Sequence, residues 1–85
     1  MHIDEIDEEI IRLFALRSEY VHEIVKFKND EESVIAQKRK DTVIKLRGEW
    51  AEKAGLNKST FEQIYLLLLR QNIKEELVLL EQQRK

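Results

Sequence analysis

An apolar seam in the first third of the chain restricts the fold most strongly. From residue 3 to residue 27, apolar side chains recur at alternating intervals of three and four, the spacing that places them on one face of an α-helix. A second apolar row lies beside the first, so one packing partner would not cover both. The sequence therefore predicts a first helix at about residues 3 to 29 with neighbours on two sides. The seam contains Ile3, Ile6, Ile10, Leu13, Tyr20, Ile24 and Phe27, and the second row contains Ile11, Phe14, Val21 and Val25.

The length of this helix points to association. A helix of about 27 residues is ~40 Å long, whereas a compact chain of 85 residues has a radius of gyration of only ~12 Å. The helix ends would project unless a second chain covered them. The chain also has no Cys that could staple a core of this modest size. We expect an intertwined helical homodimer.

The remainder of the chain predicts two further helices, at about residues 34 to 53 and 60 to 83. The chain has no Pro and two Gly, a composition that favours helix throughout. Asp30 or Ser33 is a candidate N-cap for the second helix, and Gly55 suits a left-handed C-terminal cap. Ser59 and Glu62 match a capping box for the third helix. The predicted fold is an all-α, three-helix chain that forms a single domain over residues 1–85.

Composition excludes several classes of partner and chemistry. The net charge is −2 and acids alternate with bases, whereas nucleic-acid binders carry a basic excess. The longest apolar run has six residues, far fewer than a membrane span needs, and the acidic N-terminus does not resemble a signal peptide. His2 and His22 lack a metal-ligand pattern, and His22 is interpreted as solvated. We expect a soluble, cytoplasmic protein with no metal, cofactor, nucleic acid or membrane partner.

Several charged and polar residues fall on apolar faces. Arg17 occupies a position of the first seam, and Lys28, eleven residues later, lies about 20° away around a helix. Asn72 and Glu76 continue the apolar line of the third helix. Arg39 shares the predicted buried face of the second helix, which also contains Val43, Leu46 and Trp50. A buried ion costs several kcal/mol without a partner. Either Arg17 pairs with Glu76 while the other cations reach solvent, or the helices bind an anion with more than one carboxylate.

Four segments resemble a known family over essentially the whole chain. They are IDEID followed by Arg17, KFK ending at Lys28, QKRKDTVIKLR containing Arg39, and WAEKAGL. Together they resemble the all-helical, AroQ-class chorismate mutases. The resemblance implies an intertwined homodimer of three-helix chains and an enzyme that rearranges chorismate to prephenate by a pericyclic shift, without covalent or acid–base catalysis.

The resemblance also implies roles for individual residues. Arg17 and Arg39 would hold the substrate carboxylates in the reactive conformer, and Lys28 would stabilise charge on the ether oxygen. Glu76 matches a glutamine that donates a hydrogen bond to that oxygen, which a carboxyl group can do only when protonated. Activity is therefore expected to rise toward acid pH. Asn72, one turn before Glu76, is a further candidate for substrate binding.

The resemblance leaves alternatives open. In the family, the site also receives an arginine from the first helix of the partner chain. That arginine would lie seven residues before Asp7, one position upstream of Met1. His2 is the nearest candidate to replace it, but His2 is out of phase with that position by about 200° around the helix. The eleven-residue spacing of Lys28 and Arg39, together with WAEKAGL, is similar to the isochorismate-pyruvate lyases of salicylate synthesis. A catalytically weak or inactive helical dimerisation homologue is the third reading.

Overall fold

The computed structural model describes residues 2–28 and 30–84 and is all-helical over those ranges, as predicted. Three long helices and two short helical segments follow one another without a strand in the described part. They are α1 (Ile3–Ile24), the 3₁₀ segment η1 (Val25–Phe27), α2 (Glu31–Ile35), α3 (Gln37–Lys53) and α4 (Lys58–Arg84).

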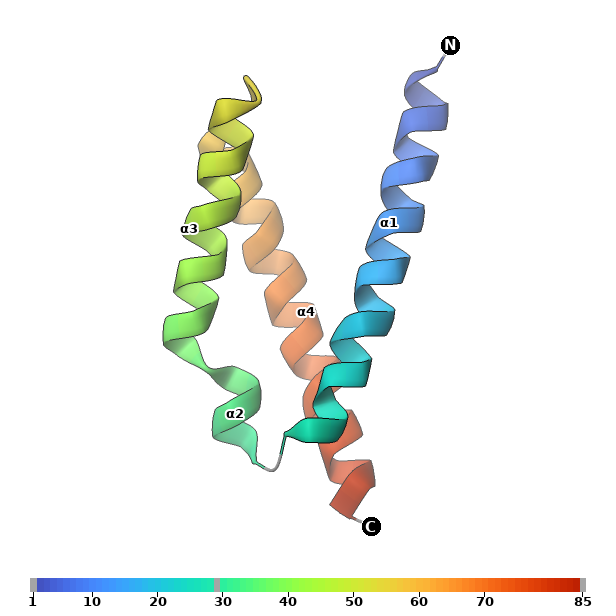
Figure 1. Cartoon of the computed structure of the whole chain (residues 1–85), viewed down its shortest axis with the longest axis vertical. Helices are drawn as coiled ribbons and strands as arrows, with labels where there is room; N and C mark the ends of the chain where they lie inside the picture. The colour runs from blue at the N-terminus through green and yellow to red at the C-terminus, as the bar shows by residue number, and fades with distance from the viewer. Residues whose placement is uncertain (1, 29, 85) are drawn as a thin grey trace.

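The helices form an open, elongated arrangement (Figure 1). α3 and α4 lie against each other, while α1 approaches α4 at one end and diverges from both helices toward its N-terminus. The chain measures 48 × 27 × 16 Å and has a radius of gyration of 14.8 Å, compared with ~12 Å for a compact chain of this length. α1 contributes no buried residue. A single chain therefore leaves the long first helix largely uncovered.

The hydrophobic core lies at the end where η1, α2 and α4 meet. Val25, Val34 and Leu80 are at most 4 % exposed there, and Ile73 and Leu77 pack against them. By contrast, every apolar residue of the predicted first seam is at least 42 % exposed. The seam follows helical spacing as expected, but the described part of this chain leaves it largely uncovered.

The first helix ends earlier than predicted. Its α-helical part stops at Ile24, and η1 follows as far as Phe27. Lys28 then adopts an extended conformation, with φ −101° and ψ 137°. The predicted boundary near residue 29 was therefore wrong, because the last turn tightens to 3₁₀ geometry, a common way for a helix to end.

The predicted second helix is divided at Ala36. This residue is left-handed, with φ 33° and ψ 65°, and it separates α2 from α3. Its backbone groups remain satisfied, because its N–H donates to Glu32 and its carbonyl accepts from Lys40. α2 begins directly after Asp30, one of the two predicted caps, whereas the Ser33 side chain lies outside the described part of the structure.

The connection between α3 and α4 confirms one predicted cap and corrects another. Gly55 has φ 82°, and the N–H groups of Gly55 and Leu56 donate to Glu52 and Ala51, which is a Schellman motif. α4 begins two residues before the predicted start, and its N-cap is Asn57, whose Oδ1 accepts from the Thr60 N–H at 2.8 Å. Ser59 lies inside the helix, so the predicted capping box was wrong.

Candidate functional site

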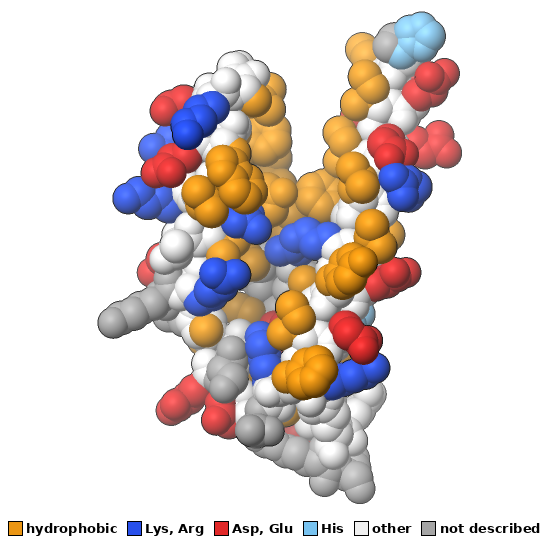
Figure 2. Space-filling view, in the orientation of Figure 1, with side chains coloured by type: hydrophobic (Ala, Val, Ile, Leu, Met, Phe, Trp, Pro, Cys, Tyr) orange, Lys and Arg blue, Asp and Glu red, His pale blue; other side chains and the backbone are white. Residues whose placement is uncertain are grey.

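A cavity of about 600 Å³ lies between α1, the α2–α3 connection and α4. Figure 2 shows basic side chains gathered around the hollow between α1 and α3. Its apolar walls include Val21, Val34, Val43 and Ile73, whereas its charged lining consists of five basic residues and one acidic residue. The basic residues are Arg17, Lys28, Arg39, Lys40 and Arg47, and the acidic residue is Glu76. A cavity with this surplus of positive charge suits an anionic ligand.

Arg17 enters the cavity from α1 and is half-buried. Its Nη1 donates to Asn72 Oδ1 at 2.7 Å, and its guanidinium carbon lies 5.8 Å from the centroid of the Tyr65 ring. Asn72 is buried on α4, as its position in the apolar line predicted. The alternative in which Arg17 pairs with Glu76 was wrong, because an uncharged amide takes that place. This contact therefore brings no negative charge to balance the positive charge of Arg17.

Lys28 and Glu76 form the ion pair of the cavity. Lys28 Nζ donates to Glu76 Oε1 at 3.3 Å, and the two side chains are 23 % and 7 % exposed. Lys28 does not reach the cavity by helical phase, because it lies beyond η1 in extended backbone. The prediction that Lys28 shares a helix face with Arg17 was therefore wrong, although Arg17 and Lys28 do line one cavity. Glu76 is buried on α4, as predicted.

Arg39 lines the cavity from the first turn of α3 but is exposed. The buried face predicted for it also contained Leu46 and Trp50, which are 37 % and 52 % exposed. Val43 is the member of that predicted face which is buried, so the predicted face was wrong at Leu46 and Trp50. Arg39, Arg17 and Lys28 line one cavity, and their roles there stay a prediction.

Two cavity residues, Lys40 and Arg47, were absent from the predicted set. Arg47 is half-buried, and its guanidinium carbon lies 4.6 Å from the Trp50 ring centroid and 5.8 Å from that of Tyr65. The signal was present in the sequence, since Arg47 follows Val43 by four residues and therefore lies on the same face of a helix.

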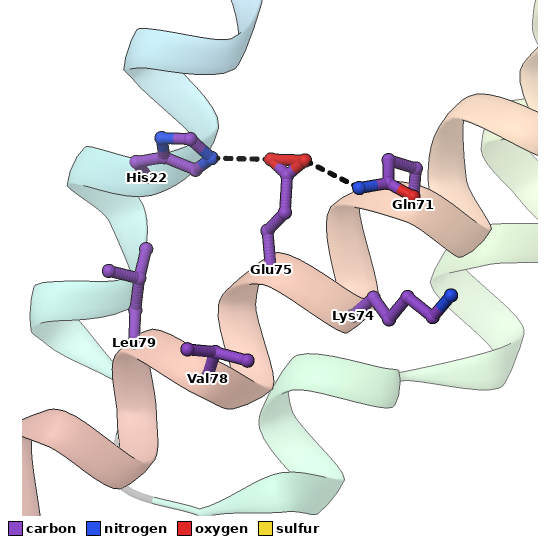
Figure 3. A pocket seen from close by; sticks show the side chains of 6 residues that line it. All are labelled: His22, Gln71, Lys74, Glu75, Val78 and Leu79. Carbon is purple, nitrogen blue, oxygen red and sulfur yellow. Dashed lines mark hydrogen bonds and ion pairs between the residues drawn. The ribbon is translucent and has the colours of Figure 1, made fainter.

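A second, smaller pocket of about 380 Å³ lies along another face of α4. Figure 3 shows His22 of α1 and Gln71 on either side of Glu75. Glu75 Oε1 lies 2.7 Å from His22 Nε2, and Glu75 Oε2 accepts from Gln71 Nε2 at 2.9 Å. These hydrogen bonds, that of Gln71 first, lower the pKa of Glu75 below 4.5. His22, which we interpreted as solvated, is 42 % exposed and bound to this carboxylate.

Over residues 2–28 and 30–84, no three His, Cys, Asp or Glu side chains are grouped so that they could hold a metal ion. Within the same ranges, no helix combines the length and the apolar character needed to cross a bilayer.

Comparison with known proteins gives one family and two relatives. A family model described as chorismate mutase type II matches residues 1–77. A Pseudomonas aeruginosa protein named isochorismate pyruvate lyase is 29% identical over 75 residues, which is 88% of this chain and 74% of that protein. A Haemophilus influenzae protein named T-protein is 32% identical over 75 residues, which is 87% of this chain but 20% of that protein.

Proposed function

Since the chain belongs to the chorismate mutase type II family, we propose that it is a chorismate mutase that rearranges chorismate to prephenate. The family and the name of the Pseudomonas aeruginosa relative, isochorismate pyruvate lyase, support an enzyme that acts on chorismate-like substrates. The observation that carries the proposal is the cavity, whose lining has five basic residues and one carboxylate. Chorismate is a dianion with two carboxylates, so its charge complements this surplus.

Arg17 and Arg39 would fix the substrate's shape. They reach the cavity from two different helices, α1 and α3, so each can hold one carboxylate of the same molecule. A pericyclic rearrangement needs the two atoms that form the new bond to lie close together while the old bond breaks. Holding the two carboxylates in place supplies that geometry before the barrier is crossed. Asn72 supports this role, because its amide oxygen fixes the orientation of the Arg17 guanidinium.

Lys28 and Glu76 would act on the bond that breaks. As the ether C–O bond lengthens, negative charge develops on the oxygen, and a fixed ammonium among apolar walls stabilises that charge strongly. Lys28 is three-quarters buried beside Val34 and Ile73 on the cavity wall. Glu76, when protonated, would donate a second hydrogen bond to the same oxygen.

The direct test is product identification. The pure protein is incubated separately with chorismate and with isochorismate, and the products are separated by chromatography. Prephenate from chorismate supports the mutase. If the protein leaves both compounds unchanged, the proposal fails and a helical dimerisation module without catalysis becomes the better reading.

The pH dependence tests the role of Glu76. If its protonated form donates to the ether oxygen, the mutase rate rises toward acid pH, and Glu76→Gln flattens the profile because an amide donates at every pH. The rates are measured at saturating chorismate on protein whose fold is checked at each pH. A flat wild-type profile would contradict this role.

The lyase is a second candidate. Its support is the 29% identical relative named isochorismate pyruvate lyase, 74% of which the match covers. A lyase would release pyruvate from isochorismate and leave salicylate, so the product experiment separates the two activities.

We also propose that the active form is an intertwined homodimer. The apolar seam of α1 supports this, since it is at least 42 % exposed along its whole length in the single chain, and large exposed apolar faces mark interaction sites. Light scattering of the purified protein should give twice the 10.2 kDa mass of the chain. A monomer at micromolar concentration would contradict this.

A further inference from the structure

We propose that Arg47 binds a carboxylate of the substrate and makes the site selective for dicarboxylates; this inference rests on the proposed function. Arg47 and Arg39 both line the cavity from α3. They are eight residues apart, or ~12 Å along the helix axis. The wall therefore presents two guanidinium groups rooted at separate levels, an arrangement that matches a ligand whose two negative charges are also separated.

The guanidinium group of Arg47 packs against two aromatic rings. The guanidinium carbon lies 4.6 Å from the Trp50 ring centroid and 5.8 Å from the Tyr65 centroid. Cation–π contacts of this kind restrain the group without using its N–H donors, which point outward in the guanidinium plane. Among the described residues, Arg47 has neither a carboxylate nor an amide partner. Its donors are thus available to an anion.

The other deep cations of the cavity are already engaged. Arg17 donates to Asn72 and Lys28 donates to Glu76. Arg17 and Arg47 also converge on one ring, since each guanidinium carbon lies 5.8 Å from the Tyr65 centroid. An anion in the cavity that both groups line would meet positive charges from two different helices, and planar guanidinium groups match the geometry of a carboxylate. The structure therefore assigns Arg47 to recognition of the ligand's charge.

The test compares Arg47→Met with Arg47→Lys and with the control Arg70→Met. Met keeps an apolar stem that can cover Trp50, Lys keeps the charge, and Arg70 is exposed on α4 outside the cavity lining. KM and kcat are measured with chorismate and isochorismate, and calorimetry measures binding of two probes. The probes are prephenate, a dicarboxylate, and phenylpyruvate, which lacks the ring carboxylate. Thermal unfolding checks that each variant is folded.

Arg47→Met should raise KM about 10- to 100-fold, the loss expected for one hydrogen-bonded charge contact, with a smaller change in kcat. It should also weaken the preference for prephenate over phenylpyruvate, which Arg17 and Arg39 then support alone. Arg47→Lys should lie between Arg47→Met and the wild type, and Arg70→Met should match the wild type. A folded Arg47→Met variant with the wild-type preference would overturn the inference.

Binding and turnover separate this inference from the proposed function. If the wild type turns over neither substrate but its preference for the dicarboxylate probe depends on Arg47, the proposed function fails and the inference stands. If chorismate is converted and Arg47→Met has the wild-type KM and preference, the inference fails and the proposed function stands.

Discussion

Glu75 and Glu76 are neighbours on α4, yet they face two different environments. Glu76 is buried in a cavity whose lining otherwise carries five basic residues. Glu75 lies in the second pocket, where its hydrogen bonds to His22 and Gln71 engage both of its carboxylate oxygens. Each carboxylate thus has a basic partner, but only the cavity around Glu76 contains several basic residues beyond that partner. A functional site is indicated by the surplus of charge and not by the presence of a buried or half-buried pair.

The largest difference between the two regions should appear when Lys28 loses its charge. Lys28→Met removes the ammonium proposed to stabilise the ether oxygen, and loss of one such group costs about 10²- to 10³-fold in kcat/KM. Lys26→Met is the matched control, because Lys26 is exposed and pairs with Glu23 at 3.1 Å. The control should retain activity within about twofold. Equal losses of kcat/KM in Lys28→Met and Lys26→Met would show that the cavity lysine is no more important for activity than a surface lysine.

Truncation of the two carboxylates should separate their contributions to stability. Glu76→Ala leaves the partly buried Lys28 without its partner and should lower the free energy of unfolding by about 1–3 kcal/mol. Glu75→Ala removes a more exposed pair and should cost less than about 1 kcal/mol. Urea denaturation of both variants and the wild type measures these differences. A larger loss for Glu75→Ala would mean that the second pocket, and not the cavity, holds the structural ion pair.

The smallest effect is the pH dependence contributed by Glu75. Because the pKa of Glu75 in the folded chain lies below 4.5, its ionised form stabilises the fold above that pH, and this contribution is lost as the pH falls through the folded value. The Tm of Glu75→Gln should therefore lie below that of the wild type at about pH 6 and approach it at about pH 3. A constant difference between the two Tm values would show that ionisation of Glu75 has no part in stability.

Periodicity predicted the parts of this molecule that depend on regular helix. The all-α fold, the apolar line containing Asn72 and Glu76, and the Gly55 cap were all found. Arg17, Lys28 and Arg39 were assigned to one site on a family resemblance, and the three do line one cavity. The fold, the apolar line and the glycine cap could be predicted because helical spacing and left-handed glycine are local properties of the chain, whereas the roles of the three cations stay a prediction.

The errors lie where the backbone departs from regular helix or where packing decides. Nothing in the sequence around Ala36 marks a left-handed residue, so a single second helix was predicted. The predicted inward face lies wholly within α3, and Leu46 and Trp50 of that face are exposed because the described part of the single chain does not cover them. Lys28 reaches the cavity through a 3₁₀ turn that phase arithmetic does not contain. Arg47 was overlooked although it follows Val43 by four residues, and one of its two aromatic contacts is to Tyr65 of α4, which the periodicity of α3 cannot reveal.

The left-handed backbone of Ala36 has a consequence for how this chain can vary. Residue 36 lies on the cavity wall and sets the direction in which α3 leaves α2, so Arg39, Lys40 and Arg47 move together if that direction changes. Gly enters the left-handed region freely, Asn and Asp do so at modest cost, and β-branched residues are strongly disfavoured. Related chains that keep the same cavity should therefore show a narrow choice of residues at this position.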